Sequence, residues 1–126
     1  MSARRLVLID DSEIVLAVLA PSLTEAGFEV RAVSSLRQFI NAVLDWRPHL
    51  IVTDLYMPDM SGAQLCEWLR SQMDTAKTPI IICSSAPPEE LERVVREVYA
   101  DGWVSKDDGP EALGVRLNAL CEEIVW

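Results

Sequence analysis

The sequence predicts a doubly wound α/β domain, in which helices cover both faces of a parallel β-sheet. Continuous apolar runs of strand length recur along the chain, as expected for strands that are covered on both faces. Segments with apolar residues at helical spacing alternate with these runs, as in successive βαβ units. The length of 126 residues suits a single domain with a sizeable core, so we treat residues 1–126 as one domain.

Five segments have the character of strands. We expect them at 6–9, 28–32, 50–53, 79–83 and 102–105. The second should be half exposed and the last is brief, whereas the other three are apolar almost throughout. Right-handed crossovers between parallel strands leave few possible arrangements of them.

Five helical segments alternate with the strands. The first begins at the capping residue Ser12 and stops at Gly27, and Pro21 within it should kink it. Apolar residues extend over much of its circumference, which indicates either a thickly buried helix or a contact surface. The others are expected at 36–46, at 63–73, from Pro88 and from about residue 111. Their expected core positions are Phe39, Ile40, Val43 and Leu44, then Leu65, Cys66, Leu69 and Met73, then Leu91, Val94, Val95 and Val98, and finally Leu113, Leu117, Leu120 and Ile124.

The formal net charge of −9 limits the classes of partner. Nucleic acid and anionic membrane surfaces both demand a basic face, so we expect direct binding to neither. Cys66, Cys83 and Cys121 are scattered and are expected to be reduced core residues, not disulfides or metal ligands. The basic start leads into only a short apolar run, so neither a signal peptide nor a membrane span is predicted. These features favour the cytoplasm.

Polar side chains stand at the carboxyl ends of four predicted strands. Asp10 and Asp11 follow the first strand, and Asp54 follows the third. Ser84 follows the fourth strand and Lys106 the fifth. In a doubly wound sheet these ends lie on one rim, where such folds bind their ligands. The sequence therefore predicts one shallow site with three carboxylates, a hydroxyl and an ammonium group.

This set of groups suits phosphoryl transfer to a carboxylate. Clustered aspartates repel one another, and Mg²⁺, which binds one or two carboxylates together with phosphate oxygens, relieves the repulsion. Asp54 could attack phosphorus as an ionised carboxylate and form an acyl phosphate without a general base. The charge of the transition state would be shared by the metal, Lys106 and Ser84.

Each residue also has a purely structural explanation. Asp54 can cap a turn through its own backbone, and Ser84 can be a turn residue. Asp10 can interact with the positive end of a helix, and Lys106 can be an ordinary solvated lysine. Taken singly, these explanations are as good as the functional ones or better. The complementary set at four strand ends favours a functional site.

With these residues the chain resembles, over its full length, the receiver domain of response regulators in two-component signalling. The resemblance rests on the Asp10–Asp11 pair, on Asp54 within the segment TDLYMPDMSG, on Ser84 and on Lys106. It implies a flavodoxin-like fold with strand order 2-1-3-4-5 and five helices.

The resemblance also implies a role for each residue of the site. Asp54 resembles the phosphoacceptor and a metal ligand. Asp11 resembles the direct Mg²⁺ ligand with Asp10 supporting it, and the backbone carbonyl of Tyr56 resembles the third protein ligand. Lys106 resembles a contact to the phosphoryl group.

The switch elements follow from the same resemblance. Ser84 resembles the hydroxyl that contacts the phosphoryl group, and Trp103 stands where the family keeps its rotameric switch aromatic, usually Tyr or Phe. Ser85 replaces a small apolar residue. Asp107 replaces the proline that usually follows the lysine, so the usual cis bond is not expected there.

The function expected from the resemblance is a phosphorylation-switched signalling domain and not an enzyme for external substrates. The phosphohistidine of a sensor histidine kinase or phosphotransfer protein, or a small acyl phosphate, would donate to Asp54. The fourth and fifth helices would then present a changed face to a downstream protein or to a second copy. Tyr56 and Ala86 would flank incoming water, and the bulk of Tyr56 would slow dephosphorylation. A single-domain regulator and a piece of a larger protein both fit the end at Trp126.

Two other functions stay open. One is a phosphorylation-independent pseudo-receiver that interacts with partners, which Asp107 and Trp103 favour. The other is an aspartate-nucleophile phosphatase, but such enzymes usually place a second Asp two residues after the nucleophile, where this chain has Tyr56. His49, the single histidine, is expected to be a solvated loop residue and not a phosphodonor.

Overall fold

In the computed structural model, which describes residues 3–124 and 126, five parallel strands form one sheet in the order β2-β1-β3-β4-β5. The strands are β1 (Arg5–Ile9), β2 (Glu29–Val33), β3 (Leu50–Thr53), β4 (Ile80–Ser84) and β5 (Gly102–Ser105). The helices are α1 (Glu13–Glu25), α2 (Leu36–Trp46), α3 (Gly62–Ser71), α4 (Pro88–Val98) and α5 (Pro110–Glu123), and a 3-10 helix, η1 (Lys106–Asp108), precedes α5. The doubly wound fold and its strand order are confirmed.

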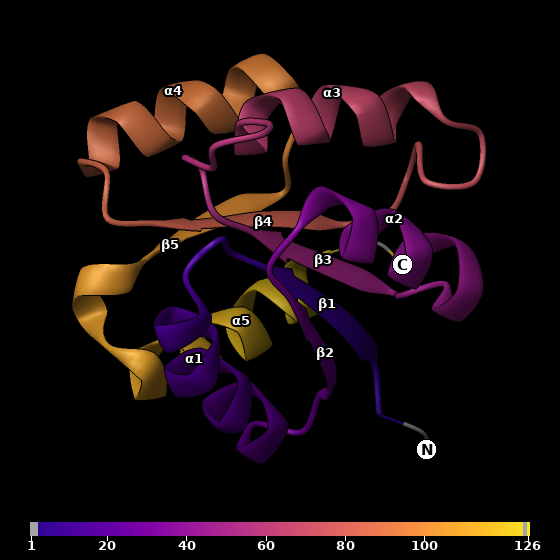
Figure 1. Cartoon of the computed structure of the whole chain (residues 1–126). Helices are drawn as coiled ribbons and strands as arrows, with labels where there is room; N and C mark the ends of the chain where they lie inside the picture. Colours follow the sequence, from indigo (N-terminus) through magenta and orange to yellow (C-terminus); the bar gives the residue numbers. More distant parts are fainter. Residues whose placement is uncertain (1–2, 125) are drawn as a thin grey trace.

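Helices cover both faces of the sheet (Figure 1). α2, α3 and α4 lie on one face, and α1 and α5 lie on the other. Each face has its own apolar cluster: Val7 and Ile51 belong to the first, and their neighbours Leu8 and Val52 to the second. Since successive residues of a strand point to opposite faces, the central strands must be apolar throughout.

Serine side chains begin three of the helices. Ser12, Ser35 and Ser61 precede α1, α2 and α3, and each hydroxyl accepts a hydrogen bond from a backbone N–H of the first turn. These bonds satisfy donors that have no partner inside the helix. α4 and α5 begin instead with Pro88 and Pro110, whose missing N–H is not needed at the first helical position.

Two predicted core positions are wrong. Met73 is 95% exposed, because α3 already ends at Ser71 and Met73 lies in the turn that follows. Leu44 is 62% exposed, because it lies one position beyond the buried Val43 and so beside the apolar stripe of α2. The other core positions predicted on these helices are buried or half-buried.

The apolar circumference of α1 is only partly buried. Leu16, Leu19 and Leu23 face the core, whereas Ile14 is 80% and Val18 50% exposed. The expectation of a thickly buried helix is therefore wrong. The helix runs through Pro21 without a break, and the kink stays a prediction.

The three cysteines are buried and free. Burial raises the pKa of the Cys66 and Cys83 thiols to about 12, so both stay protonated at neutral pH. The prediction that the three cysteines are core residues is confirmed.

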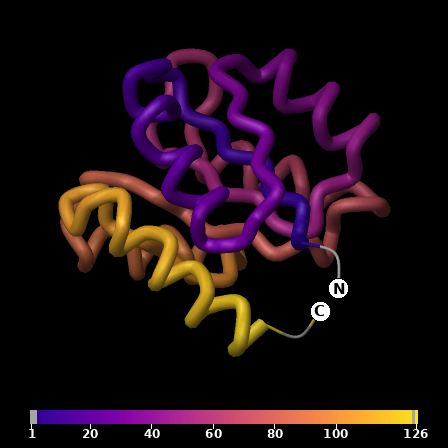
Figure 2. The backbone as a smooth tube through the Cα atoms, turned by 90° about the horizontal axis from the view of Figure 1, so that it is seen from below, coloured from indigo at the N-terminus to yellow at the C-terminus, as the bar shows by residue number. Residues whose placement is uncertain are grey.

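The two ends of the chain approach each other on one side of the molecule (Figure 2). The Arg4 guanidinium lies 4.2 Å from the centre of the Trp126 ring. The indole N–H of Trp126 donates to the Cys121 carbonyl at 3.0 Å. Within residues 3–124, no helix has the length and apolar character needed to cross a membrane.

Candidate functional site

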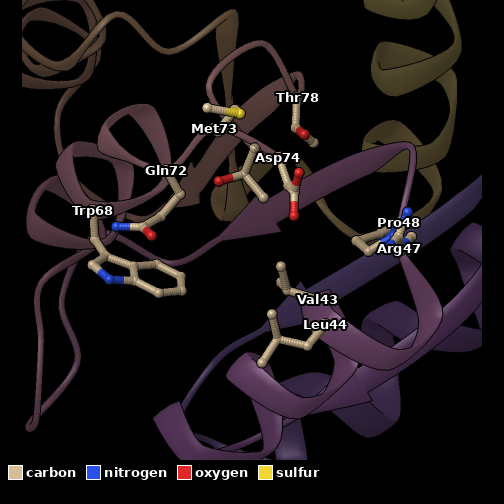
Figure 3. A pocket seen from close by; sticks show the side chains of 10 residues that line it. Val43, Leu44, Arg47, Pro48, Trp68, Gln72, Met73, Asp74 and Thr78 are labelled. Atoms are coloured by element: carbon tan, nitrogen blue, oxygen red, sulfur yellow. The ribbon is translucent and has the colours of Figure 1, made fainter.

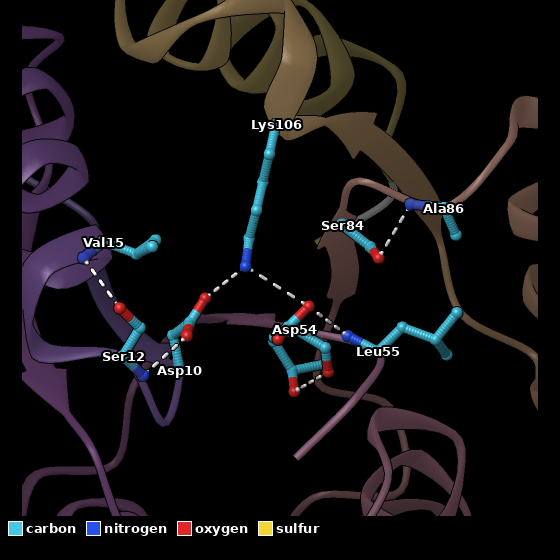
Figure 4. A network of polar contacts seen from close by, with 9 residues as sticks. Asp10, Ser12, Val15, Asp54, Leu55, Ser84, Ala86 and Lys106 are labelled. Atoms are coloured by element: carbon cyan, nitrogen blue, oxygen red, sulfur yellow. Dashed lines mark hydrogen bonds and ion pairs between the residues drawn. The ribbon is translucent and has the colours of Figure 1, made fainter.

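The parallel sheet brings four strand ends to one rim, and the predicted polar residues meet there (Figure 4). Asp10 follows β1, Asp54 follows β3, Ser84 ends β4 and Lys106 follows β5. The backbone fixes the first two ends to each other, because the Asp54 N–H donates to the Ile9 carbonyl at 3.1 Å.

Lys106 joins two of the aspartates. Its Nζ lies 2.5 Å from Asp10 Oδ2 and 3.3 Å from Asp54 Oδ1. Asp10 is almost completely buried and Asp54 is buried with it, so their carboxylates depend on this ammonium group for charge compensation. The ion pairs place Lys106 in the site and rule out an ordinary solvated lysine.

The pKa values of Asp54 and Lys106 reflect both burial and the charges beside them. Burial raises the pKa of Asp54, the nearby Lys106 opposes this, and the charge of Asp10 adds to the rise. Burial works against the Lys106 ammonium, yet its hydrogen bond to Asp10 and the charge of Asp54 leave the pKa of Lys106 raised. The charge of Asp10 therefore makes Asp54 costlier to ionise, and Lys106 is held in its charged form.

Backbone N–H groups hold the carboxylates in place. Asp10 Oδ1 accepts from the Ser12 N–H at 2.9 Å, and Ser12 in turn caps α1 by accepting from the Val15 N–H at 3.2 Å. Asp54 Oδ1 accepts from the Leu55 N–H at 2.8 Å. Asp10 thus sits where the start of α1 favours a negative charge, as its structural explanation stated, and belongs to the site as well.

Asp11 completes an acidic cluster. One carboxylate oxygen each from Asp10, Asp11 and Asp54 lies within 4.8 Å of the others. Asp11 is exposed and has room to turn toward a ligand. Three carboxylates with one ammonium leave a net negative, all-oxygen donor set, which fits a hard divalent cation such as Mg²⁺.

Ser84 is buried but does not contact Asp54 in this structure. Its Oγ accepts a hydrogen bond from the Ala86 N–H at 3.2 Å, across the first turn after β4. Trp103 is half-buried and packs against the apolar cluster on the α2 to α4 face of the sheet. Asp107 lies in η1, and residues 3–124 contain no cis peptide bond.

The mouth of the site is a cavity of about 360 Å³ between the loop after β3 and the start of α4. Asp54, Ser84 and Lys106 line it, and so do Tyr56 and Glu90. The phenol of Tyr56 donates a hydrogen bond to the Glu90 carboxylate. Sequence reasoning missed Glu90, because nothing in the order of residues relates a loop residue to a helix residue 34 positions later.

A glycine allows the chain to pass close to Asp54. A Cβ atom on Gly62 would lie 2.2 Å from the Asp54 carbonyl oxygen, well inside contact distance. The Gly62 N–H donates to the Leu55 carbonyl at 2.8 Å and closes the loop that follows β3. The absence of a side chain on Gly62 therefore lets the start of α3 pack closely against the backbone of Asp54. Tyr56 lies in the loop that connects these two points.

A second cavity of about 380 Å³ lies between the ends of α2 and α3 (Figure 3). It is lined by Leu44, Pro48, Trp68 and Met73 among others, and by the charged residues Arg47 and Asp74. These segments precede β3 and β4, so the cavity lies at the amino edge of the sheet, opposite Asp54. It gathers none of the predicted site residues.

His49 lies at the same amino edge. It is exposed, and its Nδ1 accepts from the Arg5 N–H at 2.9 Å. Slight burial and the charges of Arg5 and Arg4 lower the pKa of His49. The expected solvated loop residue is confirmed, and His49 is remote from the acidic cluster.

Comparison with known protein families gives one match over most of the chain. Residues 6–118 match the family described as response regulator receiver domain. The matched range contains the acidic cluster, Ser84 and Lys106.

Curated relatives agree with this match. The transcriptional regulatory protein GltR of Pseudomonas aeruginosa is 35% identical over 120 residues, which cover 94% of this chain and 49% of that protein. The phosphate regulon transcriptional regulatory protein PhoB of the same species is 28% identical, over 95% of this chain and 52% of its own length. The chain thus spans about half the length of these relatives.

Solved structures agree in fold. The chemotaxis response regulator CheY4 of Vibrio cholerae superposes with a TM-score of 0.85 at 26% identity, over 94% of this chain and 99% of that one. The signal receiver domain of a histidine kinase from Syntrophus aciditrophicus gives a TM-score of 0.81 at 27% identity, over 97% and 92%.

Proposed function

Because this chain belongs to the response regulator receiver domain family, we propose that it is a phosphorylation-switched domain with Asp54 as phosphoacceptor. The observation that best supports this proposal is the position of Asp54. Its carboxylate lines an open cavity and lies 3.3 Å from the Lys106 ammonium. The donor is the phosphohistidine of a sensor histidine kinase or phosphotransfer protein, or a small acyl phosphate. We place this exchange in the cytoplasm, where free cysteines such as those of this chain persist.

The chemistry follows from the triad of Asp10, Asp54 and Lys106. An Asp54 carboxylate oxygen forms the new bond to phosphorus while the bond from phosphorus to the donor breaks. Lys106 compensates the charge on the phosphoryl oxygens, and Asp10 keeps the ammonium group oriented toward the cavity.

Mg²⁺ would be held by Asp10, Asp11, Asp54 and the backbone carbonyl of Tyr56. When bound, it would supply positive charge against the carboxylates and the phosphoryl oxygens. The all-oxygen cluster with its excess negative charge supports this assignment.

The switch starts at Ser84. Its Oγ now accepts from the Ala86 N–H, and we infer that a phosphoryl group on Asp54 draws the hydroxyl away from this bond. The populations of alternative conformations then change in three places: the loop from Ser84 to Pro88, α4 and Trp103. Such a coupling is typically worth about 1–3 kcal/mol. The face from α4 to α5 would bind a downstream protein or a second copy, with no direct role for nucleic acid or membrane.

The chain would promote only its own phosphorylation and dephosphorylation. Tyr56 supports this proposal, since it occupies the position where phosphatases of external substrates need their second aspartate. A phosphorylation-independent module is the second candidate, and the observation that favours it is Asp107 in η1, which adds a carboxylate directly after Lys106.

Intact mass after incubation with acetyl phosphate, with and without Mg²⁺, tests the proposal. We expect the wild type to gain one phosphate only with Mg²⁺, and Asp54→Ala to gain none. Asp59→Ala is the matched control, because Asp59 is an exposed acid of the same loop and its variant should behave as wild type. Absence of a gain in the wild type, also with a histidine kinase as donor and with Mg²⁺ binding shown separately, would favour the phosphorylation-independent module.

A further inference from the structure

Two side chains from different elements meet over the cavity that contains Asp54. Tyr56 belongs to the loop after β3, and Glu90 is the third residue of α4. The Tyr56 phenol donates a hydrogen bond to the Glu90 carboxylate, and both residues line the cavity with Asp54, Ser84 and Lys106.

Burial does not fix the Tyr56 ring. The residue is 57% exposed, so core packing leaves its ring free to turn away from the cavity. The hydrogen bond to Glu90 is the contact that ties its far end to α4. The direction in which the ring points therefore depends on Glu90.

Glu90 is free to serve this contact. Arg93, one turn further along α4, has its guanidinium 3.2 Å from Glu97. Glu90 forms no ion pair with any residue in the part of the chain that the structure describes.

We propose that Glu90 is a positioning residue, which holds the Tyr56 ring across the cavity and restricts the approach of water to an acyl phosphate on Asp54. This inference rests on the proposed function. In the step that it slows, a water oxygen bonds to phosphorus and the bond from phosphorus to Asp54 breaks. Asp54 recovers its carboxylate, and the water protons leave with inorganic phosphate or to solvent.

The pair also connects the phosphoacceptor loop to the helix beside the switch hydroxyl. Glu90 lies six positions after Ser84, in the first turn of the helix that follows its loop. Movement of that loop on phosphorylation therefore changes how far the Tyr56 ring covers Asp54. The lifetime of the phosphoryl group thus becomes coupled to the position of α4.

The test measures loss of phosphate from the purified, phosphorylated protein in Mg²⁺. Glu90→Ala and Tyr56→Phe should each speed the loss by roughly fivefold, the size of effect that one hydrogen bond typically carries. The double variant should lose phosphate no faster than either single variant, because both remove the same contact. Glu90→Gln keeps an acceptor for the phenol without the charge and should restore most of the wild-type lifetime.

Glu89→Ala is the matched control, since it removes an exposed carboxylate from the same helical turn and should leave the lifetime unchanged. In the unphosphorylated protein, Glu90→Ala should also shift the NMR signals of the Tyr56 ring, assigned through Tyr56→Phe. A wild-type lifetime in Glu90→Ala, or additive effects in the double variant, would overturn the inference. A wild type that takes up no phosphate would instead overturn the proposed function, and with it the proposed role of Glu90 and Tyr56.

Discussion

The cavity above Asp54 and the cavity between α2 and α3 have similar volumes, about 360 and 380 Å³, but they lie at opposite edges of the sheet. The first receives Asp54, Ser84 and Lys106 from the carboxyl ends of three strands. The second is lined by residues from the ends of two helices and the loops after them, half of them apolar and half polar, with Arg47 and Asp74 as its charges.

The two cavities differ in the chemistry of their lining residues and not in their volume. Parallel strands bring their carboxyl ends together by backbone geometry alone, so polar residues at these ends act on one another. At the amino edge the chain merely returns from helix to strand. Among the described residues, neither charged residue that lines the second cavity, Arg47 or Asp74, is in an ion pair, whereas Lys106 pairs with two carboxylates.

The largest difference between the two cavities should appear in phosphate uptake. Lys106→Met removes the ammonium that we propose compensates charge on the phosphoryl oxygens, and we expect uptake from acetyl phosphate to slow roughly 100-fold. Arg47→Met removes a cation from the other cavity and should leave the rate unchanged. Circular dichroism should first establish that both variants are folded. Equal rates in the two variants would remove Lys106 from the proposed chemistry.

Gly62→Ala tests how tightly the backbone is packed beside Asp54. The new Cβ would meet the Asp54 carbonyl oxygen at 2.2 Å, so the loop must move, and we expect a loss of about 2–3 kcal/mol in the free energy of unfolding. Gly27→Ala, at the end of α1, meets no atom within 4 Å and should cost about 1 kcal/mol for its φ of +107°. Urea unfolding compares the two. A smaller loss for Gly62→Ala than for Gly27→Ala would show that the loop beside Asp54 yields easily.

The sequence was enough to predict that the acidic residues gather at the carboxyl ends of the strands. It was not enough to predict the side-chain contacts around them. Asp10, Asp54, Ser84 and Lys106 could be placed at one edge of the sheet because the alternation of strands and helices brings their strand ends together, while their roles stay a prediction. The contact between Tyr56 and Glu90 could not, since a side-chain contact between a loop and a helix leaves no periodic signal. The exposure of Met73 was also out of reach, because apolar spacing does not show where a helix ends.

The pKa of Asp54 leads to a smaller effect on stability. Burial raises it above the ordinary value of 3.8, so the folded state binds this proton more tightly than the unfolded chain. The resulting stability is fully present below pH 3.8 and is lost as the pH rises through the folded pKa. Asp54→Asn avoids this loss, and without divalent cations its free energy of unfolding at pH 7 should exceed that of the wild type.

Denaturant unfolding of both proteins from pH 4 to pH 7 in EDTA measures this difference. The stability gap between Asp54→Asn and the wild type should widen as the pH rises. A gap that narrows with rising pH would mean that Lys106 outweighs burial and lowers the pKa of Asp54.

The smallest effect should come from the other cavity. Met73 is 95% exposed, so Met73→Gln removes little apolar contact and should change the free energy of unfolding by less than about 0.5 kcal/mol. Leu69, one turn earlier and fully buried, is the matched control, and Leu69→Ala should cost about 2–5 kcal/mol. A loss above 1 kcal/mol in Met73→Gln would mean that Met73 closes over the cavity in solution. The cavity between α2 and α3 would then be part of the core. It would differ from the open cavity above Asp54 in solvent access as well as in the residues that line it.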